Sequence, residues 1–349
     1  MDSDSCRKGS PLQLVASLST GAIQRPNTAV FRLVIAYPFH MRCVLGFDGG
    51  GTKTECVLMD ESGGILARSR SGPSNPTRVG VDAALAALIE AAEKALTASS
   101  QSVSEVVGIY GAVAGVGTAR ATPEFIRRLK LKFPNANVAI DTDLAVSLAA
   151  IGEKPSIVVI AGTGSAVFGT DASGSTARDG GFGPVLGDPG SAYENGRKAL
   201  VMESRRLLSG EVSYLRNEIL GAFKCNWVDL QDQIRANPDS VLPKIFPLVT
   251  RAANEGDESA RVLLPSAARE LSEFVARVVD RLKLGEGKFF LAKTGGVFGR
   301  SPFFDNAFDK LVLEIAPKAK IGPLPAPVAD FCARAARDCL DGPVRRAES

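Results

Sequence analysis

Histidine is almost absent from this chain, and its cysteines are few and scattered. His40 is the single histidine of 349 residues, and none of the six cysteines forms a Cys-x-x-Cys pair. This shortage argues against a zinc site built from Cys and His and against a Ser-His-Asp triad. Scattered cysteines in a chain of this size are typical of reduced, mostly buried thiols in a cytoplasmic protein.

Long apolar runs and a strong charge of one sign are also missing. No apolar run approaches the roughly 20 residues of a membrane helix, and Asp2 and Asp4 before the apolar stretch 12–23 are unlike a signal peptide. The net charge of +3 gives no electrostatic case for nucleic acid or an anionic membrane. With 45% hydrophobic residues, the chain is long enough for two soluble domains.

The first 40 residues show no clear period, and a regular pattern begins near Met41. We interpret Met41 as the natural start and residues 1–40 as an N-terminal extension that need not be native. A genuine extra strand or arm is the alternative. No helix-turn-helix pattern is evident in this stretch, so a role as a transcription factor lacks support.

A strand, a glycine-rich turn and two further strands follow residue 41. The first strand, 43–47, runs into Asp48-Gly49-Gly50-Gly51-Thr52, and a second strand covers 55–59. A turn at 60–64 precedes a third strand that begins at Ile65. This is the first of two similar units.

The second unit begins with a buried strand at 157–160. It leads into Gly162-Thr163-Gly164-Ser165, another strand and a turn at 171–174. Thr52 precedes Asp60 by the same number of residues as Thr163 precedes Asp171. Two turns in the same register indicate an internal duplication.

The remaining pattern alternates helices and strands before residue 190 and is mostly helical after it. Hydrophobic periodicity predicts helices over 81–96, 123–131, 144–149, 271–282 and 331–340, and strands over 106–110, 138–140 and 289–292.

The two glycine-rich turns are candidate phosphate sites. Neither fits the P-loop or the Rossmann pattern, because each lies between two strands rather than before a helix. Glycines let backbone N–H groups approach phosphate oxygens closely. Either turn alone could be an ordinary tight turn, but the pair could hold one triphosphate from two sides. The candidate residues are Gly50, Gly51, Thr52, Lys53, Gly162, Thr163 and Gly164.

Three carboxylates follow predicted strands. Asp48 could hold Mg²⁺, mostly through water, or could cap the turn. Asp143 could be the general base toward a hydroxyl or the N-cap of the helix at 144–149. Asp141 competes for either role, and we favour Asp143 as the base.

Further loop residues gain meaning only from a family resemblance. The strings GFDGGGTKTECVL, GPSNP, DTDLAVSLAA, VIAGTGSAV, GGFGPVLGDPGSAY and TGGVF together resemble the BadF/BadG/BcrA/BcrD-type ATPase family, and within it the N-acetylglucosamine kinases. The resemblance covers about residues 41–340. It implies an α/β, two-domain actin/hexokinase-like (RNase H-like duplicated) ATPase fold with ATP and Mg²⁺ as cofactors.

The resemblance also implies a domain division and residue roles. The expected parts are an N-terminal domain at 41–153, a C-terminal domain at 154–326 and a last helix at 327–349 that crosses back to the first domain. Asp143 would accept the proton of an amino sugar hydroxyl, and Asp48 would serve Mg²⁺. The sugar would contact Asn75, Gly181, Phe182 and Asp188, and the nucleoside would contact Gly295 and Gly296.

The chain departs from the family pattern at a few places. The family usually has Trp at the position of Phe182 and Glu at that of Pro189, and it has small residues where this chain has Asp330 and Phe331. Two other functions therefore stay open: an ATPase that activates a CoA-ester dehydratase or reductase, and an impaired sugar or nucleotide sensor. A homodimer is a possible assembly.

Overall fold

The computed structural model describes residues 41–340 and contains two five-stranded sheets. The interpretation of residues 1–40, with Cys6 and His40, lies outside the described residues. The first sheet has the strand order β3-β2-β1-β4-β5, with β1 antiparallel to β2 and parallel to β4. Its strands are β1 (Cys43–Gly49), β2 (Thr54–Asp60), β3 (Ile65–Ser71), β4 (Val106–Val113) and β5 (Asn137–Asp141).

The second sheet repeats this topology. Its order is β10-β9-β6-β7-β8, with β6 antiparallel to β7 and parallel to β9. Its strands are β6 (Ser156–Ala161), β7 (Ser165–Thr170), β8 (Thr176–Gly180), β9 (Phe290–Thr294) and β10 (Lys320–Pro323). The expected strands are therefore present, and the inferred duplication is confirmed.

The hydrogen bonds of the second turn in each unit also match. The Asp60 amide donates to the Gly64 carbonyl at 2.9 Å, and the Asp171 amide donates to the Ser175 carbonyl at 3.0 Å. In both turns the aspartate Oδ1 accepts hydrogen bonds from within the turn. The glycine inside each turn has φ = +92°, a conformation that other residues rarely adopt. Local turn chemistry therefore sets the register of both hairpins.

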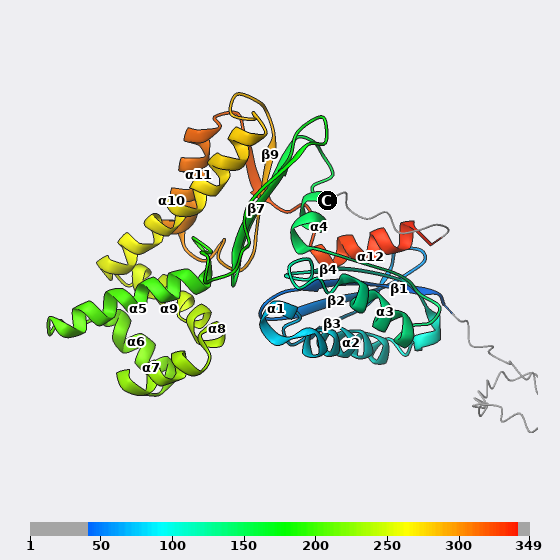
Figure 1. Ribbon diagram of the computed structural model, residues 1–349, viewed down its shortest axis with the longest axis horizontal. Coiled ribbons are helices and arrows are strands. Elements are labelled where there is room, and N and C mark those ends of the chain that lie inside the picture. The colour runs from blue at the N-terminus through cyan, green and yellow to red at the C-terminus, as the bar shows by residue number, and fades with distance from the viewer. Residues whose placement is uncertain (1–40, 341–349) are drawn as a thin grey trace, which may run out of the picture. The chain divides into compact units, whose positions relative to one another are not determined.

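Each sheet is covered by helices on both faces (Figure 1). Helices α2 (Val81–Ala98) and α3 (Thr122–Lys132) cover one face of the first sheet, and α12 (Val328–Asp338) covers the other. Helix α10 (Glu258–Arg281) packs on one face of the second sheet, and α4 (Asp143–Ala149) packs on the other.

The helices that follow the fifth strands reach the other sheet. Helix α4 follows β5 and lies between the sheets, since it contacts β4 of the first as well as β6 and β7 of the second. Helix α12 follows β10 of the second sheet but contacts β1, β2 and β4 of the first. The start of α4 therefore lies at the junction of the two sheets.

Most remaining helices lie between β8 and β9 in the chain. The helices not yet named are α1 (Pro76–Val79), α5 (Ala192–Leu208), α6 (Tyr214–Phe223), α7 (Trp227–Ala236), α8 (Pro238–Val241), α9 (Phe246–Asn254) and α11 (Pro302–Ile315), with 3-10 turns at Val103–Glu105 and Leu242–Lys244. Helices α10 and α11 run side by side, and α5 packs against α9 (Figure 1).

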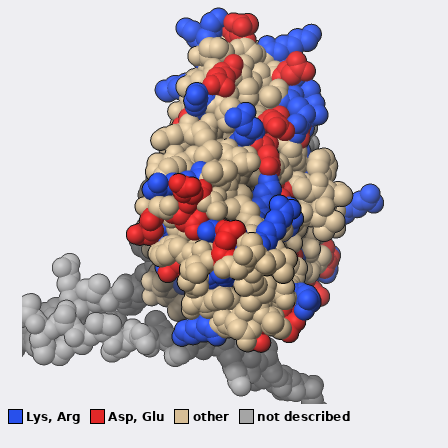
Figure 2. Space-filling model, turned by 90° about the vertical axis from the view of Figure 1, so that its left-hand side faces the viewer, with Lys and Arg blue, Asp and Glu red and all other residues tan. Residues whose placement is uncertain are grey.

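Figure 2 shows acidic and basic side chains next to one another on the face that it presents. Within residues 41–340 the structure has no helix with the length and apolar character that a membrane span requires.

Candidate active site

The two glycine-rich turns meet directly. The hydroxyls of Thr52 and Thr163 lie 2.7 Å apart, although they are 111 residues apart in the chain. Each turn is closed by one backbone hydrogen bond of 2.9 Å, from Gly50 to the Lys53 carbonyl and from Gly162 to the Gly164 carbonyl. Two glycine-rich turns, one from each sheet, thus meet at one point, as two loops that hold one triphosphate from two sides should.

The Lys53 side chain is directed to the neighbouring strand. Its ammonium group donates to Glu55 at 2.7 Å, and the side chain is 57% exposed. Of the residues predicted for the first turn, Lys53 is therefore already engaged in an ion pair. Its predicted contact with a nucleotide would require that pair to open.

Gly295 and Gly296 lie beside the second turn. Because β9 runs parallel to β6, their ends share one edge, and the Val297 amide donates to the Ala161 carbonyl at 2.9 Å. Gly295 has φ = +101°, and a Cβ there would lie 2.3 Å from the Ala161 carbonyl oxygen. A Cβ on Gly296 would meet nothing within 4 Å. The backbone at Gly296, next to Gly162, is therefore open to a ligand.

Asp48 and Asp143 come from different elements and interact electrostatically. Asp48 is near the end of β1, and Asp143 is the first residue of α4. Burial first, and then the charge of Asp143, raise the pKa of Asp48 to about 7. Burial also raises the pKa of Asp143, against the opposing effect of backbone N–H groups and of Arg178. Raised pKa values suit a carboxylate that exchanges protons near neutral pH.

Asp143 is not the N-cap of α4. Thr142 holds that position, and its Oγ1 accepts a hydrogen bond from the Ala145 amide at 3.2 Å. The alternative interpretation of Asp143 as the N-cap is therefore wrong by one residue, since threonine is also a good cap. Asp141 accepts from the Thr142 amide at 2.8 Å. Because Thr142 caps α4, the Asp143 carboxylate is not needed as the helix cap and could contact a ligand.

The loop after β8 is held by Arg178, whose charge acts on Asp143. Arg178 on β8 donates to the carbonyls of Gly180 at 3.1 Å and Gly181 at 2.8 Å. Its guanidinium also lies 5.7 Å from the centre of the Phe182 ring, which is 67% exposed. Arg178 therefore shapes the backbone around Gly181 and Phe182, two predicted sugar contacts, and also acts on Asp143.

The same loop ends at Asp188, beside the second glycine turn. A Cβ on Gly164 would lie 2.7 Å from the Asp188 Oδ2, so the carboxylate presses against that turn. Burial raises the pKa of Asp188 to about 6, against the opposing charge of Arg78 and hydrogen bonds from the Ser165 and Gly183 amides. The Oδ1 atom is buried without a hydrogen-bond partner. Asp188 thus has acceptor capacity to offer a ligand hydroxyl.

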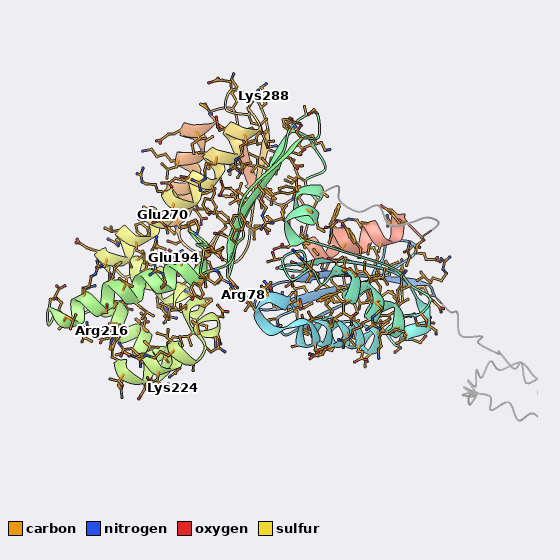
Figure 3. The ribbon with its side chains drawn as sticks, viewed as in Figure 1. Arg78, Glu194, Arg216, Lys224, Glu270 and Lys288 are labelled. Atoms are coloured by element: carbon orange, nitrogen blue, oxygen red, sulfur yellow. The ribbon has the colours of Figure 1, made fainter. Side chains whose placement is uncertain are left out.

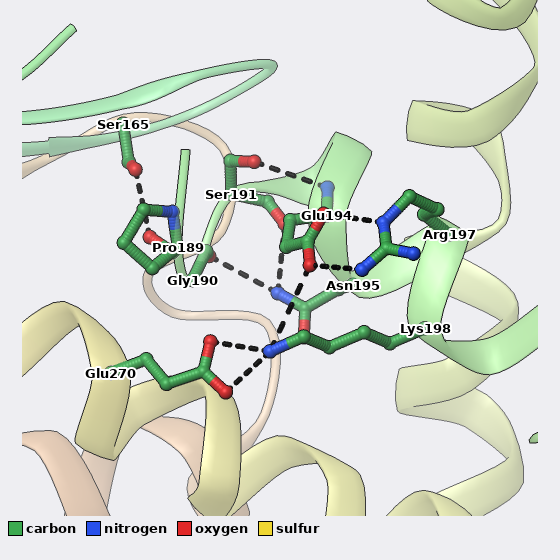
Figure 4. Close-up of polar contacts among 9 residues, drawn as sticks. All are labelled: Ser165, Pro189, Gly190, Ser191, Glu194, Asn195, Arg197, Lys198 and Glu270. Atoms are coloured by element: carbon green, nitrogen blue, oxygen red, sulfur yellow. Dashed lines mark hydrogen bonds and ion pairs between the residues drawn. The ribbon is translucent and has the colours of Figure 1, made fainter. Parts of the chain in front are cut away.

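The backbone after Asp188 is fixed by polar contacts that the sequence did not reveal (Figure 4). Ser165 donates to the Pro189 carbonyl at 2.7 Å, and Asn195 donates to the Gly190 and Ser191 carbonyls at 3.1 and 2.9 Å. Glu194 pairs with Arg197 at 2.7 Å, and Lys198 pairs with Glu270. Proline at position 189 therefore lies in a rigid segment that is held through its carbonyl.

Asn75 has a structural task besides its predicted sugar contact. It caps α1, and its Oδ1 accepts from the Thr77 amide at 3.0 Å and the Thr77 hydroxyl at 2.7 Å. A Cβ on Gly115 would lie 2.3 Å from this Oδ1, so the β4 end packs tightly on Asn75. The GPSNP string is thus explained partly by local structure.

The unusual Asp330 of α12 has a partner in the first sheet. Arg68 on β3 donates to both of its carboxylate oxygens, at 2.6 and 2.8 Å. The charge and hydrogen bonds of Arg68 lower the pKa of Asp330. This departure from the family pattern anchors α12 to the first sheet.

The structure offers little protein ligation for a metal ion. Among residues 41–340 no group of three or more His, Cys, Asp or Glu side chains could hold one. Asp48 beside Asp143 does fit a hard cation that is bound mostly through water and phosphate oxygens, because Mg²⁺ commonly keeps several waters.

Two curated relatives are similar along most of their length. An N-acetylmuramic acid/N-acetylglucosamine kinase of Clostridium acetobutylicum is 31% identical over 80% of this chain and 94% of its own. An N-acetyl-D-glucosamine kinase of Dictyostelium discoideum is 30% identical over 79% of this chain and 92% of its own.

Solved structures support the fold. A protein of Chromobacterium violaceum, provisionally named an N-acetylglucosamine kinase, superimposes with a TM-score of 0.66 at 23% identity, over 86% of this chain and 99% of its own. A ROK family glucokinase of Streptomyces griseus has a TM-score of 0.53 at 18% identity, over 85% and 99%. The expected duplicated actin-like ATPase fold is thus confirmed. Residues 45–328 also match the family model, and the chain belongs to the BadF/BadG/BcrA/BcrD ATPase family.

Proposed function

We propose that this chain is an ATP-dependent kinase that phosphorylates an amino sugar on a hydroxyl group. The observation that carries the proposal is the meeting of the Thr52 and Thr163 turns next to the start of α4, where Asp143 lies. Membership of the ATPase family and the two curated sugar kinases that match most of the chain support it.

In this proposal the two turns hold the phosphates of ATP. Backbone N–H groups of Gly51 and Gly164 bind phosphate oxygens, assisted by the two threonine hydroxyls. Gly50 and Gly162 shape the turns, because their N–H groups close them. The adenine lies against Gly295 and Gly296. Asp48 supplies a carboxylate to water-bound Mg²⁺, which would neutralise charge on the phosphates.

Asp143 removes the proton from the acceptor hydroxyl. The sugar oxygen then forms a bond to the γ-phosphorus, the bond from that phosphorus to the β-phosphate oxygen breaks, and ADP leaves. Most of the rate enhancement comes from positioning and charge stabilisation. Closure of the site excludes water, which would otherwise compete as the acceptor.

The sugar lies between the loop after β8 and Asn75. Asp188 accepts a hydrogen bond from a sugar hydroxyl through its unpaired Oδ1, while Gly181 gives the ring backbone access. Phe182 packs on the sugar where the family usually has tryptophan. The two curated relatives differ in the sugars they are named for, so we propose amino sugars as a class.

Three of the thiols argue against the dehydratase-activator function. Relatives of that kind hold an iron–sulfur cluster with cysteine thiolates. Cys43, Cys56 and Cys332 are buried here, and burial raises the pKa of Cys43 to about 12. These three thiols are therefore poor cluster ligands.

A coupled assay of ADP release tests the proposal. The substrates are glucosamine, N-acetylglucosamine, N-acetylmuramic acid and glucose, each with ATP and Mg²⁺ and with a control lacking sugar. We expect sugar-dependent ADP release with at least one amino sugar. Sugar-independent release would instead favour an ATPase, and sugar binding without any ADP release would favour a sensor.

A further inference from the structure

Arg78 is a buried cation that the sequence patterns did not single out. It belongs to α1 (Figure 3), which Asn75 caps, and its side chain is only 10% exposed. A Cβ placed on Gly51 would lie 3.2 Å from the Arg78 Cδ and 3.3 Å from its Nε. The same point lies 3.5 Å from the Thr163 Cβ. The guanidinium group therefore begins where the two phosphate turns meet.

The protein does not satisfy this guanidinium group. Its Nη1 is buried without a hydrogen-bond partner. The nearest carboxylate oxygen in an ion pair is Asp239 Oδ1 at 3.7 Å, which is too long for a hydrogen bond. Asp188 also feels the charge of Arg78, yet its Oδ1 is unpaired as well. A buried charged donor is costly to leave unpaired, so a site that keeps one is prepared for an acceptor from outside the protein.

We propose that Arg78 binds the phosphoryl group that is transferred, donating N–H groups to the γ-phosphate oxygens of ATP. This inference rests on the proposed kinase function. Phosphate is a suitable ligand for Arg78, because a planar guanidinium group can donate two parallel hydrogen bonds to two phosphate oxygens. A lysine cannot form this bidentate contact. Charge develops on the γ-phosphate oxygens during transfer, and a fixed arginine beside them stabilises it.

Three variants of the full-length protein separate this role from a structural one. Arg78→Met removes the positive charge, and Arg78→Lys keeps the charge but loses the bidentate hydrogen bonding of the guanidinium group. Asp239→Asn is the matched control. It removes the charge of the only ion-pair partner that Arg78 has among the described residues, and it changes no residue of the two glycine-rich turns. Turnover with the preferred amino sugar and the dissociation constants of ADP and of the β,γ-imido analogue of ATP are measured for each, with thermal unfolding to check folding.

We expect Arg78→Met to lower kcat by about 100-fold or more, the loss typical of removing a group that stabilises transition-state charge. Binding of the imido analogue should weaken by about 10-fold while ADP binding stays within about 2-fold, as one lost charged contact to the γ-phosphate predicts. Arg78→Lys should fall between Met and wild type. Asp239→Asn should keep kcat within about 3-fold, as expected for a loose, half-exposed pair.

Other outcomes would overturn the assignment. Equal weakening of ADP and the imido analogue, or an Asp239→Asn variant as impaired as Arg78→Met, would make Arg78 a structural link. If only the KM of N-acetylmuramic acid rises, and kcat is unchanged, Arg78 binds the carboxylate of that sugar instead of the γ-phosphate. If the wild type phosphorylates no sugar but Arg78→Met still loses only the imido analogue, the kinase function fails and the γ-phosphate contact stands.

Discussion

The two sheets share their strand order and their turns, but different residues follow corresponding strands. Asp48 precedes the last residue of β1, whereas Ile160 holds the corresponding place in β6. After β5 the chain continues with a capped helix that begins at Asp143, whereas after β10 it continues with the proline-containing segment 324–327. The first half therefore carries the proposed base, Asp143, and the carboxylate proposed to serve Mg²⁺, Asp48.

The second half supplies a long loop in their place. Between β8 and α5 the chain makes the glycine-rich segment 181–191 with Asp188, whereas β3 is followed by the short segment 72–75. The comparison teaches that each half of the duplicated frame contributes one glycine-rich turn, while the proposed base and sugar contacts come from the connections that differ. The variants below are chosen to break that division, beginning with the largest expected effect.

Replacing the carboxylate at the start of α4 should have the largest effect. We expect Asp143→Asn to lower kcat by about 10² to 10⁴, the usual contribution of a general base, with little change in the dissociation constant of ATP. The matched control is Asp141→Asn, because Asp141 ends β5 just before the cap and accepts from the Thr142 amide. If Asp141→Asn instead is the inactive variant, the base has been assigned to the wrong aspartate.

One glycine from each of the two turns should respond differently to the same substitution. A Cβ on Gly164 would lie 2.7 Å from the Asp188 Oδ2, whereas one on Gly50 would meet only the Lys53 carbonyl at 3.5 Å. We expect Gly164→Ala to displace Asp188 and to raise the KM of the sugar by about 10-fold, the cost of roughly one weakened hydrogen bond. Gly50→Ala should leave the sugar KM within about 2-fold, and equal effects would contradict the division between the halves.

The sequence predicted the repeated frame because its signals are local. Alternation along strands and Asp-x-Ser-Gly turns are set by neighbouring residues, so both hairpins could be placed before any contact was known. The helix at 144–149 was also correct, but Thr142 and Asp143 are both good caps and local pattern could not choose between them.

The long-range pairs could not be predicted in this way. Arg68 and Asp330 are 262 residues apart, and their contact depends on the packing of α12 onto the first sheet. Arg78 lies in the short helix after β3, and its neighbours Gly51 and Asp239 come from other segments of the chain. An arginine is mostly exposed in proteins, so its type alone gave no signal.

Removing the Arg68–Asp330 pair between the first sheet and α12 should have a smaller effect than Asp143→Asn or Gly164→Ala, and the effect should be on stability. Asp330 is buried while Arg68 is half-exposed, so we expect Arg68→Met to lower the free energy of unfolding by about 1 kcal/mol. Because Arg68 lowers the pKa of Asp330, this stabilisation is present above the unfolded pKa of aspartate, about 3.9, and is lost as the pH falls through the lower folded value. Urea unfolding at pH 7 and pH 3 measures it.

The control for that experiment is an arginine pair on the surface. Arg127 donates to Glu124 at 2.7 and 2.8 Å, but both side chains are well exposed. Arg127→Met should therefore change stability by only a few tenths of a kcal/mol. An equal loss in both variants, or an Arg68→Met effect that grows toward pH 3, would show that the pair does not hold α12 as inferred.

The smallest effect should be a change in pH dependence at a place where one half acts on the chemistry of the other. Arg178 of the second sheet lowers the pKa of Asp143, which burial raises. A general base must be deprotonated, so activity falls as the pH drops through its pKa. Removing the positive neighbour raises that pKa further, and Arg178→Met should move the acidic limb of kcat/KM to higher pH.

Lysine at the same position distinguishes charge from loop geometry. Arg178→Lys keeps the positive charge but loses the paired hydrogen bonds to the Gly180 and Gly181 carbonyls. It should keep the acidic limb in place while raising the sugar KM, because the loop that carries Phe182 loosens. Arg277→Met, which removes a nearby arginine that pairs with Asp179, should move neither. If the limb stays fixed in Arg178→Met or moves to lower pH, the second sheet does not tune the base, and each half contributes its chemistry independently.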